Sequence, residues 1–143
     1  MQISSLLADK GASVVTISGD ATVAEAVAEL DRHRIGALVV SADGVHIDGI
    51  VSERDVVRGL SMRQGELLSE PVRTIMTATV ATCSPGDQVD SLMETMTNRR
   101  VRHVPVVEGD ELRGIVSIGD VVKSRIGELE KDRKELVEYI TAR

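Results

Sequence analysis

Aromatic side chains are almost absent from this sequence of 143 residues, which has no Trp, no Phe and the single tyrosine Tyr139. A flat ligand therefore has to lie between aliphatic side chains, and binding of single-stranded nucleic acid by base stacking is poorly supported. The formal net charge is −6 and the pI is about 5.1. The sequence thus lacks the basic character that is typical of nucleic-acid-binding proteins, and we expect no nucleic-acid partner.

Cysteine is represented by Cys83 alone, so no disulfide can form within one chain and a reducing compartment is favoured. No apolar run approaches the ~20 residues that a membrane-spanning helix needs. The first residues, MQISSLLADKG, lack the basic and apolar segments of a signal peptide. We therefore expect a cytoplasmic protein without a membrane partner.

Several catalytic and metal-binding motifs are also missing. There is no GxGxxG and no GxxxxGK[ST], and nothing in the sequence supports a Ser-His-Asp triad. His33, His46 and His103 are not spaced as zinc ligands, either with one another or with Cys83. We expect a protein that is not an enzyme and that requires no metal or cofactor.

The most informative feature that is present is an internal repeat. GIVSERDVV occupies residues 49–57 and GIVSIGDVV occupies residues 114–122, and the two strings share seven of nine letters. The preceding segments, 21–40 and 87–107, align in the same way, with Arg34 matching Arg100. The chain therefore consists of two copies of one structural unit.

Each copy shows the pattern of a strand, a helix, a β-hairpin and a second helix. The expected strands are 13–17, 36–40 and 49–51 in the first copy and 79–83, 103–107 and 111–116 in the second. The turns around Asp43-Gly44 and Glu108-Gly109-Asp110 are ordinary hairpin signals.

The two helices of each copy have recognisable beginnings. Asp20 and Asp87 precede the first helices as expected N-caps, and Ser52 and Ser117 begin the second helices. The apolar residues of the first helices recur at spacings of three and four: Val23, Ala26, Val27 and Leu30 in one, and Val89, Leu92, Met93 and Met96 in the other.

The predicted fold class is mixed α+β, with two β-α-β-β-α motifs whose small sheets pack together around one shared core. The expected boundaries are a first motif at 1–61, a linker at 62–70, a second motif at 71–126 and a helical extension at 127–143. The last helix carries an apolar seam beyond the repeat, formed by Val122, Ile126, Leu129, Leu136 and Ile140. This seam predicts packing against a partner, and we expect a homodimer.

The repeated Ser-x-x-Asp element has two interpretations. It resembles a capping box, although Glu or Gln is more usual than Asp at the fourth position. It also suits a nucleotide, because a helix N-terminus and a serine hydroxyl can donate to phosphate while a carboxylate accepts from the two hydroxyls of a ribose. The sequence leaves both interpretations open.

The tandem motifs, the two strings above and the approaches RIGALVV and RRVRHVPVV together resemble a pair of CBS (cystathionine β-synthase) domains over roughly residues 1–126. The resemblance implies a pseudo-twofold pair, called a Bateman module, with clefts between the motifs. Such clefts bind adenosine-containing ligands such as AMP, ADP, ATP, NAD or S-adenosylmethionine, and the pairs often dimerise. They usually sense a ligand rather than transform it.

The resemblance also implies that each cleft takes its Ser-x-x-Asp clamp from one motif and its adenine-binding wall from the other. For one cleft the implied residues are Ser117 and Asp120 as the clamp, with Lys10, Gly11, Val15, Ile35, Gly36 and Ala37 as the wall. For the other they are Ser52, Arg54 and Asp55 as the clamp, with Met76, Thr77, Ala81, Val101, Arg102 and His103 as the wall.

The two clefts differ in charge. Arg54 stands where the second copy has Gly119, and Arg100, Arg102 and His103 add basic character near it. We therefore expect the Asp55 cleft to favour phosphorylated ligands and the Asp120 cleft to bind more weakly or to stay empty.

The function expected from the sequence is a regulatory module that senses an adenine nucleotide and acts on an unidentified protein. The alternative is a constitutive interaction or dimerisation scaffold in which the two Ser-x-x-Asp elements are only helix caps. Binding of nucleotide to the purified protein would distinguish the two functions.

Overall fold

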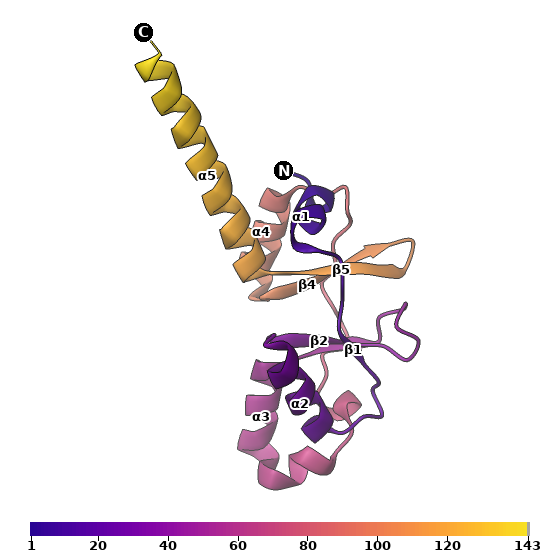
Figure 1. The fold of residues 1–143 in the computed structure, drawn as a ribbon. Helices are drawn as coiled ribbons and strands as arrows, with labels where there is room; N and C mark the ends of the chain where they lie inside the picture. The colour runs from indigo at the N-terminus through magenta and orange to yellow at the C-terminus, as the bar shows by residue number, and fades with distance from the viewer. Residues whose placement is uncertain (143) are drawn as a thin grey trace.

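The computed structural model describes residues 1–142 and consists of two stacked halves (Figure 1). The helices are α1 (Ile3–Lys10), α2 (Val23–His33), α3 (Glu53–Arg63), α4 (Val89–Arg99) and α5 (Ile118–Thr141), with short 3₁₀ segments η1 (Gln64–Ser69) and η2 (Val72–Thr74). The strands are β1 (Thr16–Ile17), β2 (Ala37–Val40), β3 (Gly49–Ser52), β4 (His103–Glu108) and β5 (Glu111–Ser117). The mixed α/β fold class predicted from the sequence is confirmed.

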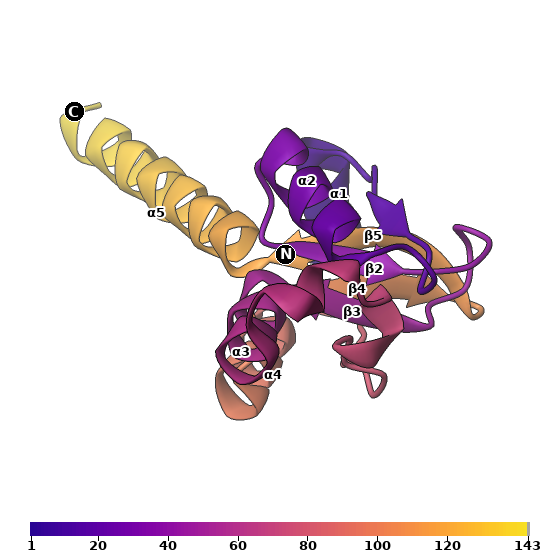
Figure 2. The same cartoon turned by 90° about the horizontal axis from the view of Figure 1, so that it is seen from below.

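The strands form two small sheets that face each other between the helices (Figures 1 and 2). In the first sheet β1 pairs parallel to β2, and β2 pairs antiparallel to β3, with Ala37 opposite Ser52. In the second sheet β4 pairs antiparallel to β5, with His103 opposite Ser117. Both hairpins therefore end at the serine that begins the following helix.

The first predicted strand of each copy is shorter than expected, and in the second copy it is wrong. Within 79–83, only a bridge between Cys83 and Val106 forms. Cys83 donates to the carbonyl of Pro105, but extension of this parallel pairing would require an N–H from Pro105 itself. The first copy has Val39 at this place, and its N–H donates to Val15. A single proline thus removes the strand.

The predicted helix caps Asp20 and Asp87 are also wrong. Helix α2 begins after Thr22, whose hydroxyl accepts from the N–H of Glu25 while the Glu25 carboxylate accepts from the N–H of Thr22. This reciprocal capping box satisfies two free N–H groups at once, which a single aspartate two residues earlier cannot do. Helix α4 begins after Gln88 without a side-chain cap.

The buried side chains form separate clusters, so the prediction of one shared core is wrong. The cluster of the first motif contains Ile17, Ala26, Leu30, Leu38, Val40, Val51 and Val72, with a smaller neighbour of Val23, Val56 and Leu67. The cluster of the second motif contains Ile3, Leu6, Leu7, Val89, Leu92, Met96, Val104, Val106, Val116 and Val121. Helix α1, which the sequence did not predict, therefore belongs to the core of the second motif.

Each motif packs against a segment that precedes the other motif in the sequence. Helix α1 from the start of the chain packs on the second motif, and the segment after η2 packs on the first. A Cβ on Gly114 would lie 2.8 Å from Cδ2 of Leu7, and a Cβ on Gly49 would lie 2.7 Å from Sδ of Met76. The glycine that opens each repeated string is thus required by the close approach of the exchanged segment.

The segment predicted as the linker is folded. Helix α3 continues to Arg63 and η1 follows immediately, with the side chain of Leu67 fully buried.

Helix α5 is the longest element, with 24 residues, and its C-terminal half extends away from the rest of the molecule (Figures 1 and 2). Within residues 1–142, no helix combines the length and the apolar composition that crossing a bilayer requires.

Candidate functional site

Both Ser-x-x-Asp elements form complete capping boxes. The hydroxyl of Ser117 accepts from the N–H of Asp120 at 3.1 Å, and Oδ2 of Asp120 accepts from the N–H of Ser117 at 2.9 Å. Ser52 and Asp55 make the same pair of bonds at 3.3 and 2.9 Å. Although Glu or Gln is more usual at this position, the shorter arm of aspartate also reaches the N-cap amide in both copies.

The capping box occupies only one of the two oxygens of each carboxylate. The Ser52 and Ser117 N–H groups reach only Oδ2 of their aspartates, and within residues 1–142 no hydrogen bond reaches Oδ1 of Asp55 or Asp120. Each carboxylate thus retains an oxygen that can accept from a ligand hydroxyl. The capping and ligand-binding interpretations of the element are compatible.

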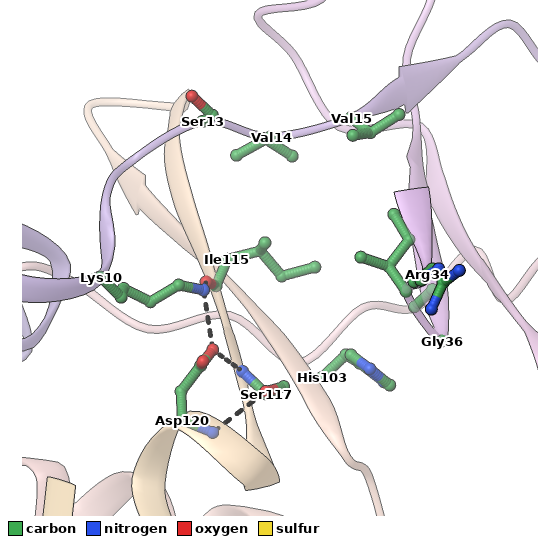
Figure 3. A pocket seen from close by; sticks show the side chains of 12 residues that line it. Lys10, Ser13, Val14, Val15, Arg34, Gly36, His103, Ile115, Ser117 and Asp120 are labelled. Carbon is green, nitrogen blue, oxygen red and sulfur yellow. Dashed lines mark hydrogen bonds and ion pairs between the residues drawn. The ribbon is translucent and has the colours of Figure 1, made fainter. Parts of the chain in front are cut away.

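A cavity of about 370 Å³ lies between the two motifs next to Asp120 (Figure 3). Its volume is within the range of small-molecule sites. It is lined by Lys10, Ser13, Val14, Val15, Arg34, Ile35, Gly36, Ala37, His103, Ile115, Ser117 and Asp120. The structure therefore brings together seven of the eight residues expected for this cleft, and leaves out Gly11, which ends helix α1 with a φ of 99°.

Lys10 holds the aspartate of this cavity in place. Its ammonium group donates to Oδ2 of Asp120 at 2.7 Å and also to the carbonyl of Ile115 (Figure 3). Burial alone would raise the pKa of Asp120, but the hydrogen bonds from Lys10 and Ser117 outweigh it and the pKa lies below its ordinary value. Asp120 is therefore ionised at neutral pH and presents a carboxylate to the cavity.

Arg34 supplies positive charge to the same cavity. It ends helix α2 in the left-handed conformation, with a φ of 52°, and its side chain lines the cavity (Figure 3). Arg100 adopts the same conformation after α4 with a φ of 53°. Arg34 takes part in no ion pair among the described residues, so its charge is available to an anionic ligand.

His103 lies at the contact between the motifs. Sequence reasoning assigned it to the Asp55 cleft, but the structure places it on the wall of the Asp120 cavity. A Cβ on Gly36 would lie 3.0 Å from Cε1 of His103, so the imidazole packs closely against the strand entry of the first motif. Burial lowers the pKa of His103 below its ordinary value, although Glu53 and Asp120 act in the opposite direction.

This lowered pKa predicts a pH dependence of stability. An unfolded chain binds a proton on His103 below pH ~6.5, whereas the folded chain does not. The free energy of unfolding should therefore fall as the pH falls through this value. We expect wild type to lose more stability in urea between pH 7.5 and 5.5 than His103→Gln.

The contribution of His46 has the opposite sign, because its hydrogen bond to Asp43 raises its pKa, but it is common to both proteins and cancels in the comparison. An equal loss of stability in wild type and His103→Gln would contradict the prediction.

On the Asp55 side, the predicted wall residues contact different parts of the molecule. Met76 packs over Gly49, and Thr77 exchanges two backbone hydrogen bonds with Ile50 next to the Asp55 capping box. Val101 instead packs against the core of the second motif. The remaining predicted residues of this cleft are the exposed Arg54 and Arg102 and the half-buried Ala81.

Sequence reasoning missed Ser13, Val14, Arg34 and Ile115, which also line the cavity. Ser13 and Val14 precede β1 in a segment that was expected to be strand from its first residue. Arg34 carried a signal that was not used, namely its match with Arg100 at the end of the aligned helix. Among the described residues no cluster of His, Cys, Asp or Glu is arranged to bind a metal.

The sequence and the fold have well-defined relatives. Residues 10–62 and 72–127 match the family described as CBS domain. The CBS domain-containing protein CBSX3, mitochondrial, of Arabidopsis thaliana is 35% identical over 146 residues, which cover 96% of this chain and 71% of the plant protein.

Two solved structures have the same fold. The CBS-domain containing protein ATU1752 from Agrobacterium tumefaciens is 45% identical, with a TM-score of 0.84 over 87% of this chain and 99% of that chain. The CBS domain protein PAE2072 from Pyrobaculum aerophilum, which was solved in complex with AMP, is 32% identical, with a TM-score of 0.75 over 84% of this chain and 89% of that chain.

Proposed function

The chain belongs to the CBS domain family, as the resemblance predicted, and we propose that it is a regulatory, non-catalytic module that binds a phosphorylated adenosine ligand in the Asp120 cavity. The observation that carries this proposal is the composition of the cavity. It combines an ionised carboxylate with a free oxygen, an unpaired guanidinium and apolar walls taken from both motifs. The AMP complex of the related Pyrobaculum protein supports the ligand class.

Each part of such a ligand has a matching group in the cavity. Oδ1 of Asp120 accepts from the ribose hydroxyls, and Arg34 binds phosphate through charge-assisted hydrogen bonds. The aliphatic side chains of Val15, Ile35 and Ile115 enclose the adenine, since no Phe, Tyr or Trp is among the residues that line the cavity. The capping box and Lys10 fix the carboxylate before the ligand arrives, so little ordering is needed on binding.

If Arg34 binds the phosphate, removal of its charge should weaken phosphorylated ligands selectively. Arg34→Ala should weaken AMP binding by roughly 10-fold or more, since a hydrogen bond to a charged group contributes about 1.5–3 kcal/mol. Binding of adenosine, which has no phosphate, should change little. Isothermal titration calorimetry with both ligands measures the difference.

Arg54→Ala is the matched control, because it removes the same charge from the other cleft. A selective loss of AMP affinity in Arg54→Ala but not in Arg34→Ala would contradict the assignment and support the original sequence-based ranking of the two clefts.

A ligand in this cavity touches both motifs and thereby links occupancy to their relative orientation. Ser117 and Asp120 belong to the start of α5, whereas Ile35 and Gly36 belong to the first motif. Binding therefore favours whichever orientation places both walls against the ligand, and the free-energy difference can be transmitted to a regulated protein.

The proposal is tested with a panel of AMP, ADP, ATP, NAD, S-adenosylmethionine and adenosine, with GMP as the control for the base. We expect at least one adenosine phosphate to raise the melting temperature while GMP does not. If no adenosine-containing ligand shifts the melting temperature or gives heat in calorimetry, the chain is a constitutive scaffold instead.

A further inference from the structure

The C-terminal half of α5 has no packing partner in the single chain. Every residue from 129 to 142 is exposed, and the helix projects away from both halves of the body (Figures 1 and 2). An isolated helix of about 12–15 residues is marginal in water even for favourable sequences. Stable helix in this segment therefore requires a surface to pack against.

Most apolar residues of this segment follow a heptad pattern, and Val137 and Tyr139 lie on either side of it. Val122, Ile126, Leu129, Leu136 and Ile140 are separated by four, three, seven and four residues, and Arg133 occupies the intermediate seam position. Each of the five apolar residues is between 51% and 59% exposed. A narrow stripe with alternating spacings of four and three is the pattern of a two-stranded coiled coil rather than of a helix that packs on a broad surface.

The charged residues beside the stripe favour a second copy of this chain in parallel orientation. Arg125 and Glu130 occupy the g and e positions that flank the seam. In a parallel pair of identical helices, Arg125 of one copy faces Glu130 of the other, and this favourable pair occurs twice by symmetry. An antiparallel pair centred on the same segment instead brings Glu130 against Glu130 and Asp132 against Asp132, which are repulsive.

From these observations we propose that α5 pairs with α5 of a second copy of this chain as a parallel, in-register coiled coil. In this arrangement Arg133 lies opposite Arg133 of the second copy, which lowers the stability of the pair but favours two strands, in which both side chains can still reach solvent. The inference goes beyond ligand binding and does not depend on it.

The pairing would also place two ligand cavities at the same end of one coiled coil. Asp120 lies in the first turn of the helix that carries the seam, and a helix of 24 residues is about 36 Å long. The proposed dimer thus joins the two cavities through a single continuous element in each copy.

The first test is a charge exchange, measured by sedimentation equilibrium. Wild type should sediment at twice the chain mass of 15.4 kDa at about 10 µM. Arg125→Glu or Glu130→Arg alone should each weaken the dimer by about 10-fold or more, because each creates two repulsive pairs. The double variant Arg125→Glu with Glu130→Arg should restore the dimer. Among the described residues the ion pairs of Arg125 are with the exposed Asp90 and the half-buried Glu128, and such surface pairs contribute little, so their loss has little effect on the fold.

The second test is disulfide trapping, which reads the orientation directly. Leu136→Cys, in a Cys83→Ser background, places identical residues opposite each other in a parallel in-register coil, within the distance that a disulfide spans. It should give a covalent dimer on mild oxidation. Glu138→Cys in the same background is the matched control on the outer face of the helix and should stay monomeric in denaturing electrophoresis.

Three results would contradict the parallel coiled coil. A wild-type monomer, a dimer that is insensitive to the charge variants, or equal cross-linking at positions 136 and 138 would each overturn the proposal. Circular dichroism of each variant at the same concentration confirms that the body remains folded, so a loss of association is read as a loss of the coil. Ligand binding is measured separately, and its failure would not affect the result.

Discussion

AMP at about 100 times its dissociation constant is expected to stabilise wild type by about 2.7 kcal/mol, which for a chain of this size is a shift in melting temperature of roughly 5–10 °C. Asp120→Asn is expected to reduce this shift to no more than about half. The reason is that Asn keeps one acceptor oxygen but loses the charge, and a hydrogen bond to a charged group contributes about 1.5–3 kcal/mol, or roughly 10–150-fold in affinity.

Without ligand, Asp120→Asn should melt close to wild type. Removal of one charge from a helix N-terminus costs about 0.3–1 kcal/mol. The ion pair with Lys10 is partly exposed, so its loss adds little. Measurement of the melting temperature with and without AMP therefore separates an effect on binding from an effect on folding.

The internal repeat supplies a matched control, since Asp55→Asn makes the same chemical change in an equivalent capping box. It should keep most of the ligand shift. If the ligand-induced shift in melting temperature is lost in Asp55→Asn and kept in Asp120→Asn, the ligand binds in the other cleft. Shifts kept in both variants would show that the two aspartates are only caps, and the proposed function would then be wrong.

The features of the fold that the sequence predicted are those that depend on local pattern. The repeat of GIVS-x-x-D was sufficient to place both hairpins and both serine-capped helices, because alternating apolar residues and N-cap chemistry act over a few residues. Most of the Asp120 cavity followed from the resemblance to a CBS pair, which implied that the end of one hairpin meets the strand entry of the other motif.

The errors arise where distant segments meet. Nothing within residues 1–12 shows that Leu7 packs against Gly114, more than a hundred positions later. Pro105 removes a strand that the β-rich sequence of 79–83 favoured, because the missing N–H belongs to the neighbouring strand. His103 was expected at the Asp55 cleft, whereas its side chain lines the Asp120 cavity, where it lies against Gly36 of the other motif.

The segment 62–70 shows the same limit most clearly, because it was expected to be the linker between the two motifs. Its anchor is Leu67, which lies between α2 and α3 beside Val23 and Val56. Gly59 makes room for it, since a Cβ there would lie 2.7 Å from Cδ2 of Leu67. A glycine inside a helix normally lowers stability relative to alanine, so its presence at this position is explained by the leucine that it admits.

Leu67→Ala should therefore destabilise the protein by about 2–5 kcal/mol, the usual cost of truncating a fully buried leucine when the cavity cannot collapse. Leu68→Ala is the matched control, because Leu68 is 40% exposed whereas Leu67 is 0% exposed. It should change the free energy of unfolding by no more than about 0.5 kcal/mol. Urea unfolding followed by circular dichroism measures both values.

A difference of this size between neighbouring leucines would identify 62–70 as part of the first motif's core rather than as a tether. The result bears on signalling, because a rigid connection transmits a change in the angle between the motifs to α3 and α2. A flexible connection would not transmit this change. Equal and small effects of the two substitutions would show that η1 is only loosely attached, and the two motifs would then have to communicate through the exchanged segments and the ligand alone.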